Sequence, residues 1–417
     1  MKVVHLNTHS YGGAAVVARR LHRAGLASGI ASSFITKYGL RSDATPGYQA
    51  LRDARLRYFL REKSADARLY RLGKLVQQLA QHRNLANRPA GLEVFSPLNR
   101  AARFADCVAA IDPDVVHLHW VNGFVDHEEF FRLNRSRKFV WTLHDMNPLT
   151  GGCHHADGCM KFSADCRACP QLAGTIDVDY ASTVLSAKAR ALSGLRDDQL
   201  TIVAPSRWIL ELSIESRVTR RFRHVLVENP AMEARAPADP AGERRALGLP
   251  LDRKVVLFVS DNLRNVRKGV ALLFEAARML PDSIQLIGIG QRTDAPDGVP
   301  MRLVGRVPEA TMQRYLSCAD ALVSASVAEN SPLVAIEALA CGTPVVSFDV
   351  GGVRELVGGD SGVLAETRSA AALARAIEAA LFTTSFSRDA IREQAKRFAP
   401  DVVMQKYRNV YAELLAS

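Results

Sequence analysis

The sequence AENSPLVAIEALACGTP, residues 328–344, determines how we expect the second half of the chain to fold. The apolar run of residues 321–326 precedes it, and a second apolar run, residues 345–348, follows it. Short apolar runs bounded by turn signals are typical of buried strands. The stretch therefore predicts a loop and a short helix between two strands of a parallel sheet.

Residues inside this stretch mark both ends of the helix. Ser331 is expected to cap its start, and Pro332 suits the first helical position, where an N–H group is not needed. Gly342 suits the left-handed conformation that ends many helices, and Pro344 prevents continuation. The helix is therefore expected to lie between Ser331 and Gly342.

Two glutamates of the stretch are expected to have different surroundings. Glu329 lies at the carboxyl end of a strand, where open parallel sheets bind ligands, whereas Glu337 lies inside the helix. The unpaired N–H groups and the dipole at a helix start attract anions. An acid on either side of such a site suits a nucleotide-sugar, which carries hydroxyl groups on both sides of its phosphates. Without further context, two glutamates are more often solvent-exposed.

The context is a frame that closely resembles retaining glycosyltransferase family 4, with two glutamates separated by seven residues. The resemblance implies an α/β chain of the GT-B fold, with two facing Rossmann-like domains, parallel sheets and a C-terminal crossover helix. It implies that Glu329 is catalytic and contacts the donor sugar, and that Glu337 contacts the ribose. It also implies that backbone amides of Ser331, Leu333 and Val334 bind the diphosphate.

The rest of the chain fits two such domains. Strand and helix patterns alternate almost throughout the 417 residues, as in parallel α/β folds. We expect an acceptor-side domain at 1–230 with a cysteine-rich loop at 151–172. A nucleotide-sugar-binding domain is expected at 231–398, and a helix returning to the first domain at 399–417.

Glycines at two places are candidates for contacting the donor. Gly12 and Gly13 follow the first strand, where a Gly-Gly turn lets backbone approach a ligand. The pattern Gly-x-Gly-x-x-Gly is absent, which argues against NAD. The resemblance implies that this turn faces the diphosphate and the acceptor, and that Val304 and Gly305 contact the base.

Lys268 is a further candidate because it starts a helix beside a strand end, a position that suits a pyrophosphate. In the family an arginine precedes a Lys-Gly pair here, and both cations hold the diphosphate, so the resemblance gives Lys268 a catalytic role. In this chain the arginine's position is occupied by Asn262. Arg264 or Arg267 is therefore expected to substitute.

Two predicted strands, residues 113–120 and 139–145, carry histidine at their carboxyl ends. A single histidine at a strand end is usually structural. The sequence Thr-Leu-His-Asp around His144 resembles the family's strand-end histidine, which implies a catalytic contact with the donor sugar near the reacting carbon. His119 is a weaker candidate for the acceptor pocket.

Four of the seven cysteines lie within seventeen residues: Cys153, Cys159, Cys166 and Cys169. The Cys-x2-Cys pair at the end is a zinc half-site, and His154 and His155 are alternative ligands for the looser first half. We expect a structural zinc ion, with free thiols or disulfides as alternatives. The stretch resembles a subset of family 4 enzymes for bacterial surface polysaccharides.

The positive charge of the chain is concentrated in one segment. Residues 52–103 carry twelve Lys and Arg against four Asp and Glu, in a chain of net charge +11. Residues 51–79 look helical, and the alternatives are a solvated face or an element, Arg52–Lys74, that contacts an anionic membrane or the acceptor. Motifs for nucleic-acid binding are absent.

The resemblance implies a retaining glycosyltransferase, and because no Asp- and Gly-rich metal loop is visible in the sequence, we expect catalysis without a metal ion. Its donor is expected to be a UDP- or GDP-sugar, and its acceptor a saccharide or lipid-linked saccharide. The first residues form a strand rather than a signal peptide, so we expect a cytoplasmic protein, at the inner face of the membrane if the basic segment binds it. The alternatives are a nucleotide-sugar epimerase of GT-B fold and a zinc-stabilised, non-catalytic binding protein.

Overall fold

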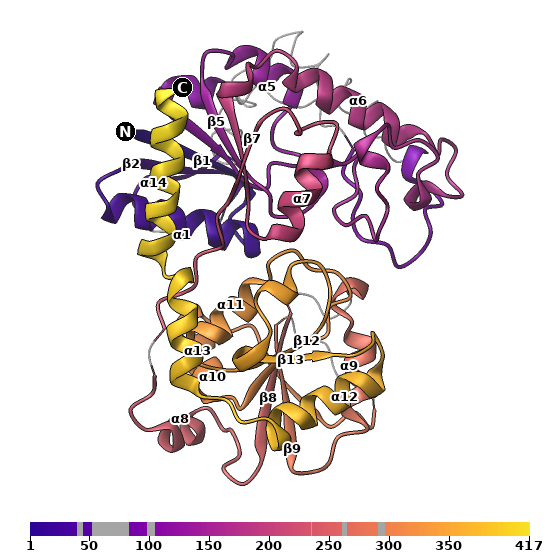
Figure 1. Cartoon of the computed structure of the whole chain (residues 1–417), viewed down its shortest axis with the longest axis vertical. Coiled ribbons are helices and arrows are strands. Elements are labelled where there is room, and N and C mark those ends of the chain that lie inside the picture. Colours follow the sequence, from indigo (N-terminus) through magenta and orange to yellow (C-terminus); the bar gives the residue numbers. More distant parts are fainter. Residues whose placement is uncertain (40–44, 52–82, 98–104, 235, 261–264, 291–296) are drawn as a thin grey trace, which may run out of the picture. The chain divides into compact units, whose positions relative to one another are not determined.

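The structure is a computed structural model that describes residues 1–39, 45–51, 83–97, 105–234, 236–260, 265–290 and 297–417 (Figure 1). Arg264 and the basic segment Arg52–Lys74 lie outside these residues, so their predicted roles stay predictions. In the described part of the chain, no helix combines the length and the apolar character that crossing a membrane requires.

The chain divides into two compact units. The first comprises Met1–Val227 together with Met404–Ser417, and the second comprises Glu228–Val403. The first division therefore falls at 227/228, where we expected 230/231. The C-terminal residues rejoin the first unit through the long helix α14, Pro400–Ala416.

The first unit contains a wholly parallel sheet whose described strands lie in the order β3-β2-β1-β4-β5-β6-β7. The strands are β1 (Lys2–His9), β2 (Ala31–Tyr38), β3 (Tyr48–Ala50), β4 (Val115–Leu118), β5 (Lys138–Thr142), β6 (Leu200–Ala204) and β7 (Arg223–Leu226). The central strands are buried on both faces, as expected for a parallel sheet covered by helices.

The helices of the first unit connect these strands. They are α1 (Gly13–Ala27), α4 (Ala105–Ile111), α5 (His127–Leu133), α6 (Tyr180–Leu192) and α7 (Arg207–Glu215). Between β5 and α6 the chain forms the cysteine-rich loop, whose only regular elements are the 3-10 turns Asn147–Leu149, Lys161–Ser163 and Pro170–Leu172.

Helix α14 packs on the first sheet through two buried tyrosines. Tyr411 Oη lies 2.8 Å from His117 Nδ1, and Tyr407 Oη lies 2.8 Å from Thr142 Oγ1. Thr142 Oγ1 in turn lies 2.8 Å from His117 Nε2. The last helix of the chain therefore supplies polar partners to side chains of β4 and β5.

The second unit repeats this plan with the strand order β10-β9-β8-β11-β12-β13. The strands are β8 (Lys254–Ser260), β9 (Ile284–Gly290), β10 (Met301–Gly305), β11 (Ala321–Ser324), β12 (Val345–Phe348) and β13 (Gly362–Ala365). The helices are α8 (Pro240–Ala246), α9 (Val270–Ala277), α10 (Glu309–Cys318), α11 (Leu333–Ala340), α12 (Ala370–Glu378) and α13 (Arg388–Ala395).

Helix α11 is the helix predicted from residues 328–344, with one error at its start. Gly342 has the expected left-handed conformation, with φ of 75°. Ser331 does not cap the helix, because Pro332 occupies the cap position and no side chain bonds the first amides. Pro332 has ψ of 113°, which is extended, so the helix begins at Leu333.

Replacing Tyr411 with phenylalanine should destabilise the first unit. The change leaves the buried Nδ1 of His117 without its partner, which costs about 1–3 kcal/mol of unfolding free energy. For a unit of this size that lowers the melting temperature by roughly 2–4 °C per kcal/mol in calorimetry. Tyr11→Phe is the control, because Tyr11 is 60% exposed and should change little. Equal melting temperatures for both variants would contradict the role of α14.

Candidate functional site

In the second unit the candidate residues lie after β8 and β11, two neighbouring strands from which the chain continues toward opposite sides of the sheet. The chain leaves β8 toward β9 on one side and leaves β11 toward β12 on the other. Such a reversal opens a crevice at the carboxyl ends of parallel strands, where open α/β sheets bind ligands. Lys268 lies in the segment after β8, and Glu329 lies in the loop after β11.

These two segments are joined by ion pairs on one buried carboxylate. Glu329 Oε1 lies 2.6 Å from Lys268 Nζ and 2.9 Å from Arg267 Nη1. The guanidinium of Arg267 also donates to the carbonyl oxygen of Ala328, at 2.9 Å. The group therefore combines two cations with one carboxylate, which leaves an excess positive charge at the sheet edge.

Gly269 lets Lys268 approach this carboxylate. It has φ of 62°, and it lies between the 3-10 turn Val266–Lys268 and helix α9. A Cβ atom at this position would overlap the carbonyl oxygen of Ala325. Lys268 therefore precedes α9 rather than starting it, in a turn that needs glycine next to it.

The start of α11 supplies groups that suit an anion. The amides of Leu333 and Val334 belong to its first turn, where N–H groups lack helical partners. Ser331 Oγ is buried, and in the described part of the chain it has no hydrogen-bond partner. Glu337 is buried farther along the helix, with 6% of its surface exposed. A buried hydroxyl without a partner is unusual and is explained if a ligand completes it.

Val304 and Gly305 end strand β10 of the same sheet, two strands away from β8. Gly305 has φ of 85°, and a Cβ atom there would meet open space. A cavity of about 450 Å³ lies at the amino-terminal ends of β8, β9 and β10, and its lining includes Arg253, Ile284 and Met301. It contains none of the predicted site residues.

In the first unit, Gly12 and Gly13 lie at the carboxyl end of β1 and start α1. Gly12 has φ of 86°, and added Cβ atoms at both glycines would meet open space. The α1 start therefore presents backbone to a ligand without a side chain in between.

His144 and His119 lie beside each other at the same edge of the first sheet. His119 Nδ1 lies 3.0 Å from His144 Nε2, and His119 Nε2 lies 3.1 Å from Nδ1 of His5 in β1. His119 is 1% exposed, and both of its ring nitrogens have partners. It therefore supports an indirect role better than contact with an acceptor. We did not predict a role for His5 from the sequence.

Burial determines the charge of these rings. It lowers the pKa of His144 to about 4 and the pKa of His5 to about 3. It also lowers the pKa of His119 well below its usual value, and neighbouring histidines add to the effect. The three imidazoles are therefore neutral at physiological pH.

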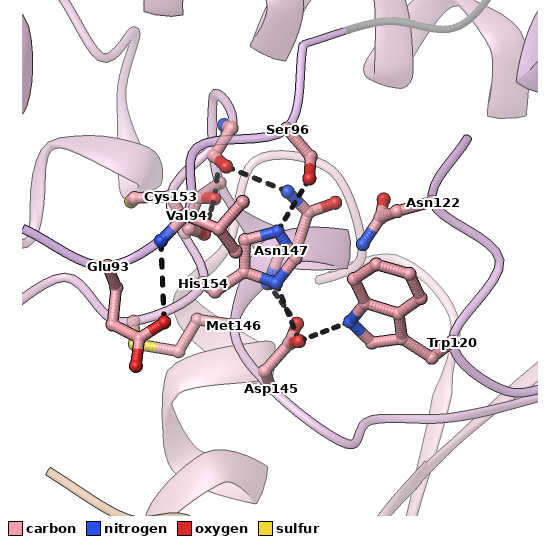
Figure 2. A network of polar contacts seen from close by, with 12 residues as sticks. Glu93, Val94, Ser96, Trp120, Asn122, Asp145, Met146, Asn147, Cys153 and His154 are labelled. Atoms are coloured by element: carbon pink, nitrogen blue, oxygen red, sulfur yellow. Dashed lines mark hydrogen bonds and ion pairs between the residues drawn. The ribbon is translucent and has the colours of Figure 1, made fainter. Parts of the chain in front are cut away.

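Asp145 lies shortly after β5, and its carboxylate accepts hydrogen bonds from neighbouring segments (Figure 2). Its Oδ2 accepts hydrogen bonds from Trp120 Nε1 and from His154 Nδ1, both at 2.7 Å, and its Oδ1 accepts from the Asn147 amide. His154 Nε2 lies 2.7 Å from Ser96 Oγ. Burial alone would raise the pKa of Asp145, but His154 holds that pKa far below its usual range.

This network fixes the backbone on which His144 stands. Asp145 is the next residue, and His154 belongs to the cysteine-rich loop. The loop is therefore anchored directly beside the candidate histidine. The only sequence signal for this role was the His-Asp pair itself, because no local pattern indicates that Trp120 and His154 bond Asp145.

All four cysteines of the loop line one small cavity of about 20 Å³. The structure joins no two of them in a disulfide, and burial raises the pKa of Cys153 to about 12 and that of Cys166 to about 11. Lys188 is buried nearby, and its ammonium group donates to Asn147 and Thr150. The predicted sulfur ligands therefore line one space that is about large enough for a water molecule.

Among the described residues, one group of three side chains brings its donor atoms within 4.8 Å of one another: His5, His117 and His119. The cysteine sulfurs do not meet this criterion as they stand. Holding a zinc ion in the cavity would require them to move closer together.

A comparison with known protein families finds a match in the second unit. Residues 253–382 match the family described as "Glycosyl transferases group 1". The matched residues cover less than a third of the chain and show what the second unit is similar to. Glu329 and Glu337 both lie within the matched residues, so the family resemblance of residues 328–344 is confirmed.

Individual proteins are similar to parts or to the whole of this chain. The putative teichuronic acid biosynthesis glycosyltransferase TuaC of Bacillus subtilis is 39% identical over 32% of this chain and 34% of its own length. The putative colanic acid biosynthesis glycosyl transferase WcaC of Escherichia coli is 24% identical over 99% of this chain and its whole length. The chain thus spans about a third of TuaC and all of WcaC.

Solved structures show the fold of the whole chain. Sucrose-phosphate synthase from Thermosynechococcus elongatus has a TM-score of 0.65 at 21% identity and covers 100% of this chain and 99% of its own. Anabaena HepE, solved with UDP and glucose, has a TM-score of 0.66 at 17% identity, with 99% of both chains covered. The predicted GT-B fold is confirmed.

Gly269→Ala should destabilise the second unit and displace Lys268. The left-handed conformation costs a residue with a side chain about 1–2 kcal/mol, and the overlap with Ala325 adds to this cost. Thermal unfolding measures the loss. Gly358→Ala is the matched control, because Gly358 is extended and a Cβ atom there meets open space. If both variants melt at the temperature of the wild type, the strained turn is not required.

Proposed function

We propose that this chain is a retaining glycosyltransferase that transfers a sugar from a nucleotide-sugar to a saccharide or lipid-linked saccharide in bacterial surface polysaccharide synthesis. The observation that carries the proposal is the group of Arg267, Lys268 and Glu329 beside the start of α11. The named activities of TuaC and WcaC support the class of product.

The donor's diphosphate fits the positive excess of this group. Lys268, Arg267 and the amides of Leu333 and Val334 would bind its oxygens, and Ser331 Oγ would gain the partner that it lacks. Arg267 thus takes the place that the family gives to an earlier arginine. Structures of HepE with UDP and with UDP-glucose favour a UDP-sugar as the donor.

Glu329 changes partners in this proposal. Without a ligand, its carboxylate is held by Lys268 and Arg267. A bound diphosphate competes for both cations, which releases the carboxylate to accept hydrogen bonds from sugar hydroxyl groups. The cations then stabilise the charge that develops on the leaving diphosphate, a role that divalent metal ions fill in other transferases. We therefore propose catalysis without a metal ion.

The resemblance to family 4 suggests roles for the remaining candidate residues of each unit. His144 would contact the donor sugar near the reacting carbon, and Glu337 the ribose. Val304 and Gly305 would contact the base, and the open backbone at Gly12 and Gly13 would face the diphosphate and acceptor. An epimerase or a non-catalytic binding protein is less favoured, because the relatives named above are transferases.

Alanine variants of the two glutamates test this division of roles. Glu337→Ala should weaken UDP binding, because the ribose loses its acceptor, and calorimetric titration measures the loss. Loss of a hydrogen bond to a charged group corresponds to about 10-fold or more in Kd. Glu329→Ala should lower turnover of the UDP-sugar while UDP itself still binds.

Glu366→Ala is the control, because Glu366 is an exposed acid of the same unit whose weak pair with Arg375 lies at 3.6 Å. A UDP affinity that falls equally in Glu329→Ala and Glu337→Ala would refute the division of roles. Absence of transfer or hydrolysis with every UDP- and GDP-sugar would refute the proposed activity.

We also propose that the four loop cysteines bind a structural zinc ion. Their position around one cavity supports this, and the nearby ammonium group of Lys188 would offset the negative charge of a zinc–tetrathiolate site. Because His154 ties the loop to Asp145, the ion would stabilise the segment that carries His144.

Elemental analysis of the purified protein should find about one zinc ion per chain. Cys166→Ser together with Cys169→Ser should lose that metal, whereas Cys318→Ser should retain it, because Cys318 lies in α10 of the other unit. Metal-free protein with four thiols that react under native conditions would show that the cysteines are free. Metal-free protein with unreactive thiols in the denatured state would show disulfides.

A further inference from the structure

We propose that His5 and His119 are positioning residues that determine which ring nitrogen of His144 carries the proton. The three rings form a hydrogen-bonded row, with 3.1 Å between His5 Nδ1 and His119 Nε2 and 3.0 Å between His119 Nδ1 and His144 Nε2. The functional meaning of the row rests on the proposed function, in which His144 meets the donor sugar. The row itself does not depend on it.

The register of the sheet creates this row. His5 of β1 pairs with His117 of β4, and His119 lies two residues farther along, so all three side chains share one face. His144 follows β5, which pairs with β4 on the other side. The row therefore leads from the buried face of the sheet to its carboxyl edge, where His144 is half-buried.

Because the three imidazoles are neutral, the row allows only two arrangements of its protons. Each ring has one N–H donor and one acceptor nitrogen, and burial keeps the pKa of each of the three rings low. If His5 Nδ1 donates to His119, then His119 Nδ1 donates to His144, and all three protons are on Nδ1. If His144 Nε2 donates instead, all three protons are on Nε2. A mixture of tautomers would break a hydrogen bond in a buried site.

The tautomer of the row determines whether the second ring nitrogen of His144 donates or accepts a hydrogen bond. Its Nε2 is engaged by His119, so Nδ1 is the atom that remains for a ligand. In the first arrangement Nδ1 donates a hydrogen bond, and in the second it accepts one. The tautomer of His5, which is 2% exposed, is thus coupled to the way in which His144 meets a sugar hydroxyl group.

His117 stands beside the row without belonging to it. Its ring is stacked on His119 with centroids 4.2 Å apart, and its own nitrogens bond Tyr411 and Thr142. The three rings of His5, His117 and His119 are close enough to share a metal ion. A metal ion on His5 Nδ1 and His119 Nε2 would remove the hydrogen bond between them, so metal binding and the row exclude each other.

Nitrogen NMR of the whole chain labelled with ¹⁵N-histidine tests the row directly. His5, His119 and His144 should show the same tautomer, all Nδ1–H or all Nε2–H. His22 is an internal reference, because its Nε2 faces the carbonyl oxygen of Pro46, which only accepts hydrogen bonds. Different tautomers within the row, or shifts of metal-bound nitrogens, would overturn the proposal.

His5→Phe keeps a ring in place and removes the end of the row. His144 should then show a mixture of tautomers, and turnover of the donor should fall roughly 10-fold to 100-fold. His22→Phe is the matched control, since His22 is fully buried with its ring 6.2 Å from His5 but outside the row. An unchanged His144 tautomer in His5→Phe would overturn the proposal.

The wild-type spectrum decides the matter if His5→Phe does not fold. A wild type that shows one tautomer in the row but transfers no sugar would refute the proposed function and leave the row intact. A wild type that is active with mixed tautomers would refute the row and leave the function intact.

Discussion

Parallel pairing of strands that lie far apart in the chain is the constraint on which both candidate regions depend. In the first sheet β1 pairs with β4, and in the second sheet β8 pairs with β11. After each pair of strands, the chain continues toward opposite sides of the sheet. The segments that follow the two strands therefore both begin at the edge where the carboxyl ends of the strands lie. This geometry places the glycines after β1 and the histidines after β4 and β5 at one edge of the first sheet. In the second sheet it places the cations after β8 beside Glu329 after β11.

Much of this arrangement could be predicted because its signals are local. The alternation of strands and helices, the stop at Gly342 and Pro344, and the position of Glu329 after a strand need only neighbouring residues. The start of α11 was wrong for an instructive reason. Proline fixes φ but leaves ψ open, so Pro332 fits a cap position as well as the first helical turn, and the extended ψ excludes Ser331 from capping.

The partners of the predicted residues could not be predicted from local signals. Lys268 and Glu329 lie sixty-one positions apart, and His5 and His119 lie 114 apart. Their contacts depend on strand order and register, which the sequence of either segment does not specify. The same holds for Asp145, because Trp120 and His154 bond it from two other segments, and Ser96 of a third segment bonds His154 (Figure 2). The prediction therefore identified single residues but missed the networks that hold them.

The position of α14 has a consequence for the order in which the protein is made. The ribosome completes the first sheet early, yet Tyr407 and Tyr411, which cover part of it, are translated after the entire second unit. Domains usually fold during synthesis, starting from the N-terminus. Until Tyr407 and Tyr411 leave the ribosome, His117 and Thr142 have each other as partners but lack the two tyrosine hydroxyl groups. The first unit therefore starts to fold first and is the last to be complete.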